Sequence, residues 1–146
     1  MEDKNKLNGQ IINQRASALE KEISNCIGTA LFLTGLRGFD EYIYEEYHDY
    51  LLNLLEEVSE PIEGALIAWQ TDLKDNIRLN YWRTYHLGVV TSVNPLLITN
   101  RNGCFGPIRI NEPFELVNNY YGCDSDNHRV KYFLPPCLAD EILGPL

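Results

Sequence analysis

The sequence predicts an α+β fold in which N-terminal helices pack on one side of a small antiparallel sheet. Three observations lead to this class. Helical periodicity dominates residues 10–58, strand-like runs rich in Val, Ile, Tyr and Trp follow it, and short turn signals separate those runs. A chain of 146 residues has the size of one domain with its own core, so residues 1–146 are expected to form a single domain.

The first two helices are predicted from periodicity and from capping residues. Residues 10–23 place apolar side chains at three- and four-residue spacing. The second helix begins at Cys26, directly after the good N-cap residue Asn25, and ends at Gly35 or Gly38. Because its apolar side chains lie nearly all round it, this helix is expected to be buried.

A third helix is predicted over residues 39–58, where an apolar stripe faces an acidic side and Pro61 stops the pattern. Residues 40–63 hold nine acidic residues and no Lys or Arg. The charge of this segment therefore equals the formal net charge of the whole chain, −9. The acidic helix over residues 40–60 is expected to be a solvated face, with docking of a basic protein partner as the alternative. Nucleic acid is not expected as a partner, because phosphate binding needs a basic surface.

Four strands and a short helix are predicted after the helical part. The strands cover residues 65–69, 79–93, 96–100 and 130–134. Asn94-Pro95 is a turn signal between the second and third strands, and Asn102-Gly103 is another. The short helix is expected over residues 113–121.

The N-terminal residues lack the order of a secretory signal, and no apolar run is long enough to cross a bilayer, so a cytoplasmic protein without membrane contact is expected. The four cysteines form no CxxC pair and are interpreted as thiols. They are Cys26, Cys104, Cys123 and Cys137. Cys123 and His128 make only half of a metal site, so neither metal nor cofactor is predicted.

Cys26 is the candidate nucleophile, because backbone N–H groups and the helix dipole at the start of a helix favour a thiolate. A neighbouring imidazole would activate the thiol, and a third polar group would fix the tautomer of that ring. His86 opens the most apolar strand, and Asn100 ends the next one. A simple hairpin turn would place His86 opposite a residue near position 103, so a contact with Asn100 requires a bulge or an offset register. The ordinary alternatives are an inert core cysteine and a structural histidine.

These patterns resemble the NlpC-like cell-wall peptidases and the wider papain-like superfamily. In that group a catalytic Cys heads a buried helix, a Gly-led apolar strand follows, a His opens the next strand in a His-apolar-Gly pattern, and a polar residue closes the strand after it. The chain has the same unpermuted order in NCIGTA at residues 25–30, EGALI at 63–67, HLGVV at 86–90 and TN at 99–100. It departs from the family at Asn25 and Ile27, where Asp and a small hydroxyl residue are usual.

The resemblance implies an NlpC-like topology and a cysteine peptidase or amidase that cleaves an amide bond through a thioester. Cys26, His86 and Asn100 would form the catalytic set. The competing predictions are a thiol acyltransferase of the same fold and a catalytically silent interaction module that binds a basic partner through the acidic helix.

Further site residues are predicted around this set. The N–H of the nucleophile would be one oxyanion donor, and Gln14 or Asn25 would supply a second. Trp82, Tyr85 and Arg101 are candidates for a substrate groove for a peptide-like or amide substrate. Sheet packing is the ordinary alternative for the two aromatic residues, and an exposed strand end is the alternative for Arg101.

Overall fold

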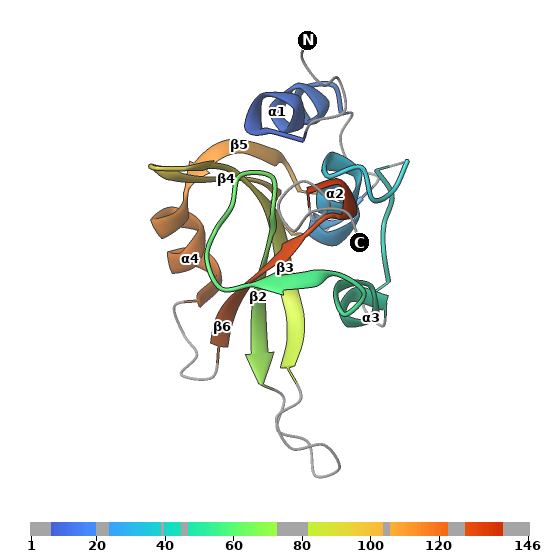
Figure 1. Cartoon of the computed structure of the whole chain (residues 1–146), viewed down its shortest axis with the longest axis vertical. Helices are drawn as coiled ribbons and strands as arrows, with labels where there is room; N and C mark the ends of the chain where they lie inside the picture. The colour runs from blue at the N-terminus through green and yellow to red at the C-terminus, as the bar shows by residue number, and fades with distance from the viewer. Residues whose placement is uncertain are drawn as a thin grey trace.

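The computed structural model describes residues 7–19, 24–38, 40–44, 47–72, 82–103, 106–122 and 128–138. Within them the α+β class is confirmed (Figure 1). The helices are α1 (Gly9–Ser17), α2 (Cys26–Leu33), α3 (His48–Leu52) and α4 (Phe114–Gly122). The strands are β1 (Glu56–Val58), β2 (Leu66–Asp72), β3 (Trp82–Val93), β4 (Leu96–Arg101), β5 (Ile108–Pro113) and β6 (His128–Leu134).

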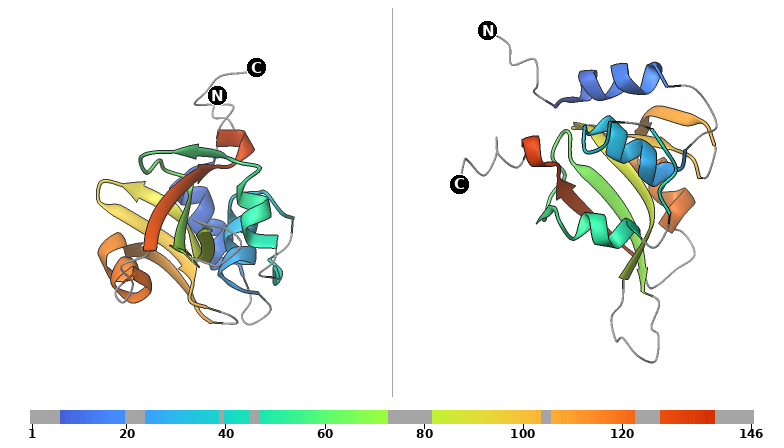
Figure 2. Two further views of the ribbon diagram at one scale, coloured as in Figure 1. Left: turned by 90° about the horizontal axis from the view of Figure 1, so that it is seen from below. Right: turned by 90° about the vertical axis from the view of Figure 1, so that its right-hand side faces the viewer.

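The strands of the described residues form one antiparallel sheet in the order β1-β6-β2-β3-β4-β5. β2 to β5 are neighbours in chain order, and β6 returns to the far side of β2. Helices α2 and α3 lie on one face of this sheet and α4 lies on the other (Figure 2). The sheet therefore separates the layer that contains α2 and α3 from the layer that contains α4.

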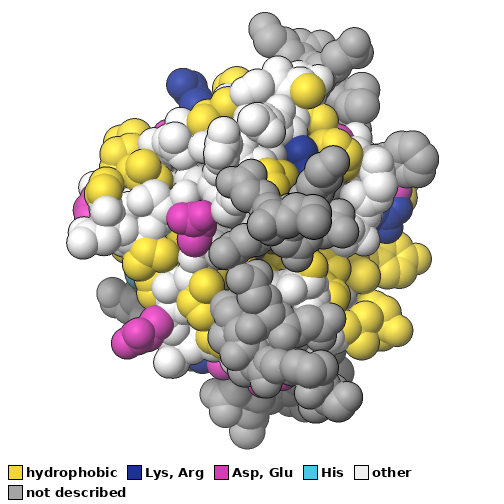
Figure 3. All heavy atoms as spheres, turned by 45° about the horizontal axis from the view of Figure 1, so that its top comes forward, with side chains coloured by type: hydrophobic (Ala, Val, Ile, Leu, Met, Phe, Trp, Pro, Cys, Tyr) yellow, Lys and Arg dark blue, Asp and Glu magenta, His cyan; other side chains and the backbone are white. Residues whose placement is uncertain are grey.

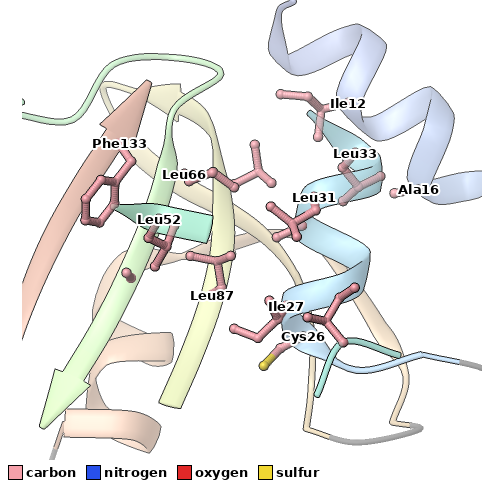
Figure 4. Close-up of a cluster of buried hydrophobic side chains, with 14 of the residues drawn as sticks. Ile12, Ala16, Cys26, Ile27, Leu31, Leu33, Leu52, Leu66, Leu87 and Phe133 are labelled. Carbon is pink, nitrogen blue, oxygen red and sulfur yellow. The ribbon is translucent and has the colours of Figure 1, made fainter. Parts of the chain in front are cut away.

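Alternate residues of the central strands supply the two cores. Leu66 and Leu87 point to the face that α1, α2 and α3 cover, and they pack with a cluster that includes Cys26 (Figure 4). Ile67 and Trp69 point to the other face and pack with Val117 of α4. This two-residue alternation is what a sheet covered on both sides requires.

Most of the predicted helices and strands are confirmed, with ends that differ by a few residues. The first helix, predicted over residues 10–23, is α1 and ends at Ser17, and residues 20–23 lie outside the described part. The second helix is α2, which ends at Leu33. The predicted strands and the short late helix correspond to β2, β3, β4, β6 and α4, and residues 79–81 of the second strand lie outside the described part.

The long helix predicted over residues 39–58 is wrong. Residues 40–44 have no regular secondary structure, α3 covers only five residues, and β1 at the end of the segment pairs with β6. Residues 39, 45 and 46 lie outside the described part. β1 and β5 were not predicted. Both are edge strands of the sheet, where the sequence pattern of a strand is weakest.

Cys26 and Cys137 are thiols rather than half-cystines, as expected, whereas Cys104 and Cys123 lie outside the described residues. Among the helices that the structure describes, none has the length and apolar character needed to cross a bilayer.

Candidate active site

The side chain of Asn25 explains why α2 begins at Cys26. Asn25 has an extended backbone, and its Oδ1 accepts a hydrogen bond of 2.9 Å from the N–H of Gly28. This is the usual N-cap arrangement, and it places Cys26 in the first turn of the helix. The sulfur of Cys26 points from this turn towards the sheet (Figure 4). The residue is 7% exposed.

Asn25 also binds residues 40–44, which come after α2 in the chain and lie against its first turn. Its Nδ2 donates to the carbonyl of Ile43 at 2.9 Å, and the N–H of Ile43 donates back to its Oδ1 at 3.3 Å. A side chain at Gly28 would collide with the carbonyl of Glu41, so only glycine lets this segment lie against the helix backbone. The amide predicted as an oxyanion donor is thus engaged in capping and in holding residues 40–44.

The structure does not bring Gln14 to Cys26. Gln14 is exposed on α1, two positions from the buried Ile12 and therefore on the opposite side of the helix. The next residue, Arg15, donates to the carbonyl of Leu33 at 2.8 Å. Leu33 ends α2, whereas Cys26 begins it, so α1 holds the far end of that helix.

His86 lies on the face of the sheet that α4 covers. It is fully buried and pairs across β2 and β3 with Trp69. The ring of Tyr121 stacks on the imidazole with centroids 3.6 Å apart and an angle of 11° between the planes, and the Trp69 ring lies 5.3 Å away. The imidazole thus has two aromatic rings as neighbours. Its neighbour Leu87 points to the other face, towards the cluster that contains Cys26.

The predicted contact between His86 and Asn100 is present, with Nε2 and Oδ1 2.9 Å apart. The offset register that this contact requires is also present. β3 and β4 pair at Ser92 with Leu97 and then at Val90 with Ile98, so Thr91 is an extra residue in β3. Because one extra residue reverses the side-chain alternation, this bulge moves Asn100 onto the face of His86.

Gly88 leaves the space that this contact needs. Gly88 lies in β3, two residues after His86. A Cβ atom at Gly88 would lie 2.7 Å from Cγ2 of Ile98 and 3.2 Å from Cβ of Asn100. The glycine of the His-apolar-Gly pattern therefore lets the two strands approach each other beside the histidine.

The hydrogen bonds of Asn100 determine which nitrogen of His86 carries the hydrogen. Nδ2 of Asn100 donates to Oε1 of Glu112 at 3.0 Å, so Oδ1 of the same amide faces His86. An amide oxygen only accepts, so Nε2 of His86 must donate. A neutral imidazole with Nε2–H has its lone pair on Nδ1. Within the described residues this Nδ1 is the one buried side-chain nitrogen or oxygen without a hydrogen-bond partner.

Burial lowers the pKa of His86 to about 3, and the hydrogen bond with Asn100 opposes this shift only in part. The imidazole is therefore neutral at neutral pH. Because Nδ1 has no partner, it makes no hydrogen bond with Cys26 in this structure. Any thiol and imidazole pair here therefore begins with a neutral imidazole.

Tyr121 connects the surroundings of His86 with those of Cys26. Its hydroxyl donates to Oδ1 of Asn102 at 2.5 Å, and the hydroxyl of Tyr85 donates to its carbonyl at 2.5 Å. Burial raises the pKa of Tyr121, and negative charge at Cys26 raises it further. The sulfur of Cys26 thus lies within electrostatic range of the phenol whose ring covers His86.

Arg101 was predicted either to line a substrate groove or to be exposed at the end of a strand, and it is not exposed. It is fully buried, and its Nη2 donates to Oδ2 of Asp40 at 2.9 Å. Its Nε and Nη1 donate to Oγ1 of Thr29 and to the carbonyl of Gly106, each at 2.7 Å. All three guanidinium nitrogens therefore bind the protein itself, which gives Arg101 a structural role one helical turn from Cys26.

The two aromatic groove candidates also contact other residues of the protein. The guanidinium of Arg129 lies over the ring of Trp82 at 4.2 Å from its centroid. Tyr85 holds Tyr121 through the hydrogen bond given above. Both contacts agree with the ordinary alternative of sheet packing for Trp82 and Tyr85.

The acidic segment does not present a helical stripe. Several of its carboxylates bind donors of the protein. These pairs are Asp40 with Arg101, Glu41 with Arg37, Asp49 with the N–H of Thr84, Glu57 with Lys131 and Glu63 with the N–H of Gly9. Part of the surface of the segment is aromatic, and hydrophobic side chains project from the side that carries α3 (Figure 3). Its exposed members include Tyr42, Tyr44, Tyr47, Tyr50 and Leu54.

Three residues around His86 were not predicted from the sequence: Trp69, Glu112 and Tyr121. Each lies in or beside a predicted strand or helix, but only the pairing of strands and the docking of α4 bring them to the histidine. Among the described residues no three His, Cys, Asp or Glu side chains are grouped to hold a metal ion. No protein-family model, no curated protein and no solved structure matches this chain.

Proposed function

We propose that the protein is a thiol hydrolase of NlpC-like topology, a peptidase or amidase in which Cys26 is the nucleophile and His86 the general base. Asn100 orients the imidazole. The observation that carries the proposal is the buried Nδ1 of His86, which holds a lone pair and has no hydrogen-bond partner. An unsatisfied buried acceptor is costly and uncommon, so it is a fitting property of an atom that receives a proton during the reaction.

The proposed reaction begins with the neutral imidazole of His86 and the thiol of Cys26. The proton of the Cys26 thiol moves to Nδ1 of His86 as sulfur attacks the amide carbonyl, and the imidazolium then gives that proton to the departing amine as the C–N bond breaks. Water attacks the resulting thioester and gives a proton to Nδ1, the C–S bond breaks, and the thiol regains the proton. A hydrogen bond between sulfur and Nδ1, which this structure does not contain, would have to form when substrate binds, since catalytic hydrogen bonds often tighten only in the complex with substrate.

Two features would lower the barrier. The ring of Tyr121 presents its π face to the imidazolium that forms during the reaction, and the tilted ring of Trp69 lies 5.3 Å from it. The N–H of Cys26 is the proposed oxyanion donor, because N–H groups in the first turn of a helix have no acceptor within the helix.

The proposed substrate is a peptide-like amide, and the proposed location is the cytoplasm. A thiol acyltransferase would share the first step and would replace water by an amine or an alcohol.

The rate of iodoacetamide alkylation at each cysteine, followed by peptide mass spectrometry, tests the proposal. Cys137 is exposed and serves as the internal control, whereas Cys26 is buried. We expect Cys26 to react at least as fast as Cys137 in spite of its burial, and His86→Gln to slow Cys26 alone by about tenfold or more, since positioned bases contribute at least that much. His128→Gln, a substitution in β6, is the matched control and should leave both rates unchanged.

The pH profile adds a second criterion. Because the pKa of His86 is about 3, its base function should persist down to about pH 4. If Cys26 reacts more slowly than Cys137 and is indifferent to His86→Gln in a folded protein, Cys26 is an inert core residue. The protein would then be an interaction module.

A further inference from the structure

We propose that Glu112 is a positioning residue that sets the tautomer of His86 through Asn100, an inference that rests on the proposed function because it assigns the proton acceptor of that site. Glu112 touches neither sulfur nor imidazole in any hydrogen bond described above. Its contact is the acceptance of a hydrogen bond from Nδ2 of Asn100 at 3.0 Å.

The three side chains form a line across three neighbouring strands on one face of the sheet. His86 lies in β3, Asn100 in β4 and Glu112 in β5, and α4 covers them. Each step is a diagonal contact between adjacent strands, which polar side chains of this length can span. Exposure increases along the line, from the fully buried imidazole to the half-buried carboxylate.

The backbone of β5 is shaped to place Glu112 on this line. β4 and β5 pair at Asn100 with Arg109 and then at Ile98 with Glu112, so β5 contains an extra residue between them. Asn111 in this bulge has a φ of 55°, which few residues other than glycine and asparagine adopt readily.

Three hydrogen bonds hold that conformation. The N–H of Asn111 donates to Oγ1 of Thr99, and its Oδ1 accepts from Oγ1 of Thr91 and from Nδ2 of Asn13. A backbone conformation that is held in this way beside a candidate site supports a positioning role for the next residue, Glu112.

Of the contacts described for His86, only that with Asn100 distinguishes the two tautomers. The ring of Tyr121 stacks on the imidazole, the ring of Trp69 lies beside it at a tilt, and Nδ1 has no partner. An amide can present either its oxygen or its nitrogen to Nε2 by rotating half a turn. The acceptor at Glu112 favours the orientation that presents oxygen, and this keeps the lone pair on Nδ1.

Without that acceptor, Asn100 can present Nδ2 to His86. The imidazole would then accept at Nε2 and carry its hydrogen on Nδ1, where it cannot receive the thiol proton. Removal of Glu112 should therefore reduce base function without any change to His86 or Cys26.

The direct test is the ¹⁵N NMR spectrum of the His86 ring, which reports the tautomer without any substrate. The wild type should show hydrogen on Nε2 only. Glu112→Leu should shift the ratio of tautomers towards Nδ1–H by about tenfold, which is what one hydrogen bond of ordinary net strength produces. Glu112→Gln retains an acceptor oxygen and should show a smaller shift, and Glu115→Gln, at an exposed position of α4, should show none.

A second background makes the test specific. In Asn100→Asp, the carboxylate beside His86 presents an acceptor oxygen whichever way it is turned. The double variant with Glu112→Leu should therefore keep hydrogen on Nε2. If Glu112→Leu alone leaves the tautomer unchanged, the inference is overturned even where alkylation of Cys26 depends on His86. If the tautomer shifts while Cys26 alkylation is indifferent to His86, the positioning role stands and the proposed hydrolase fails.

Discussion

Asn100 and Arg101 are consecutive in β4, and their side chains hold opposite faces of the sheet. Asn100 binds His86 on the face of α4, and Arg101 binds Asp40 on the face of α2, each at 2.9 Å. The end of β4 thus fixes both the proposed base and the surroundings of the helix that begins with Cys26. The contribution of the contact between Arg101 and Asp40 to protein stability can be tested separately from the role of the contact between His86 and Asn100 in the proposed chemistry.

Removal of Asp40 should destabilise the protein strongly. Asp40→Ala leaves the fully buried guanidinium of Arg101 without its ion-pair partner, and such a loss costs about 3–5 kcal/mol. The free energy of unfolding in urea, followed by tryptophan fluorescence, measures the loss. Arg37→Met provides the matched control, because it breaks the exposed pair with Glu41 and should cost less than about 1 kcal/mol. A loss for Asp40→Ala no larger than that of the control would contradict the structural role of the buried pair.

Stability should fall in mild acid because of His86. Its pKa is 6.5 in the unfolded chain and is lowered by burial to about 3 in the fold. Between these values the unfolded chain binds a proton that the folded chain does not, so stability decreases as the pH falls through this window and is unaffected by His86 above it. From pH 7 to pH 5 this one group should remove about 2 kcal/mol of unfolding free energy.

Urea unfolding of the wild type and of His86→Gln at both pH values measures this contribution. The carboxylates remain in both proteins, so the difference between the two pH dependences isolates the histidine. Equal pH dependence in the two proteins would show that His86 is not held neutral by burial.

The hairpin of β3 and β4 was predictable from sequence, whereas the position of its bulge was not. Apolar β-branched runs around Asn94-Pro95 indicate two paired strands, and the need for an offset between His86 and Asn100 follows from counting residues. No residue type marks Thr91 as the extra one. Its place is set by the hydrogen bonds of Thr91 with the carbonyl of Leu97 and with Asn111 in β5.

The segment after α2 shows why periodicity failed there. Its apolar residues recur at helical spacing, but Asp40 is bound by Arg101 at a sequence separation of 61, and Ile43 by Asn25 at a separation of 18. Local patterns contain no information on such partners. The cost of leaving the buried guanidinium of Arg101 without Asp40 outweighs the small propensity that favours helix. The interpretation of Arg101 as an exposed strand end was wrong for the same reason.

Gly88→Ala should weaken the contact between His86 and Asn100 and destabilise the protein by about 1–3 kcal/mol, the usual cost of an added methyl group in a packed core. The new Cβ would lie 2.7 Å from Cγ2 of Ile98, so the strands must separate beside the histidine.

Gly38→Ala is the control, because a Cβ at Gly38 meets nothing within 4 Å, and it should change neither property. Urea unfolding gives the stability, and the ¹⁵N spectrum of His86 reports the contact through the proton on Nε2. If Gly88→Ala keeps wild-type stability and an unchanged Nε2–H signal, the strands tolerate a side chain there. The glycine of the His-apolar-Gly pattern would then have no part in holding the proposed base.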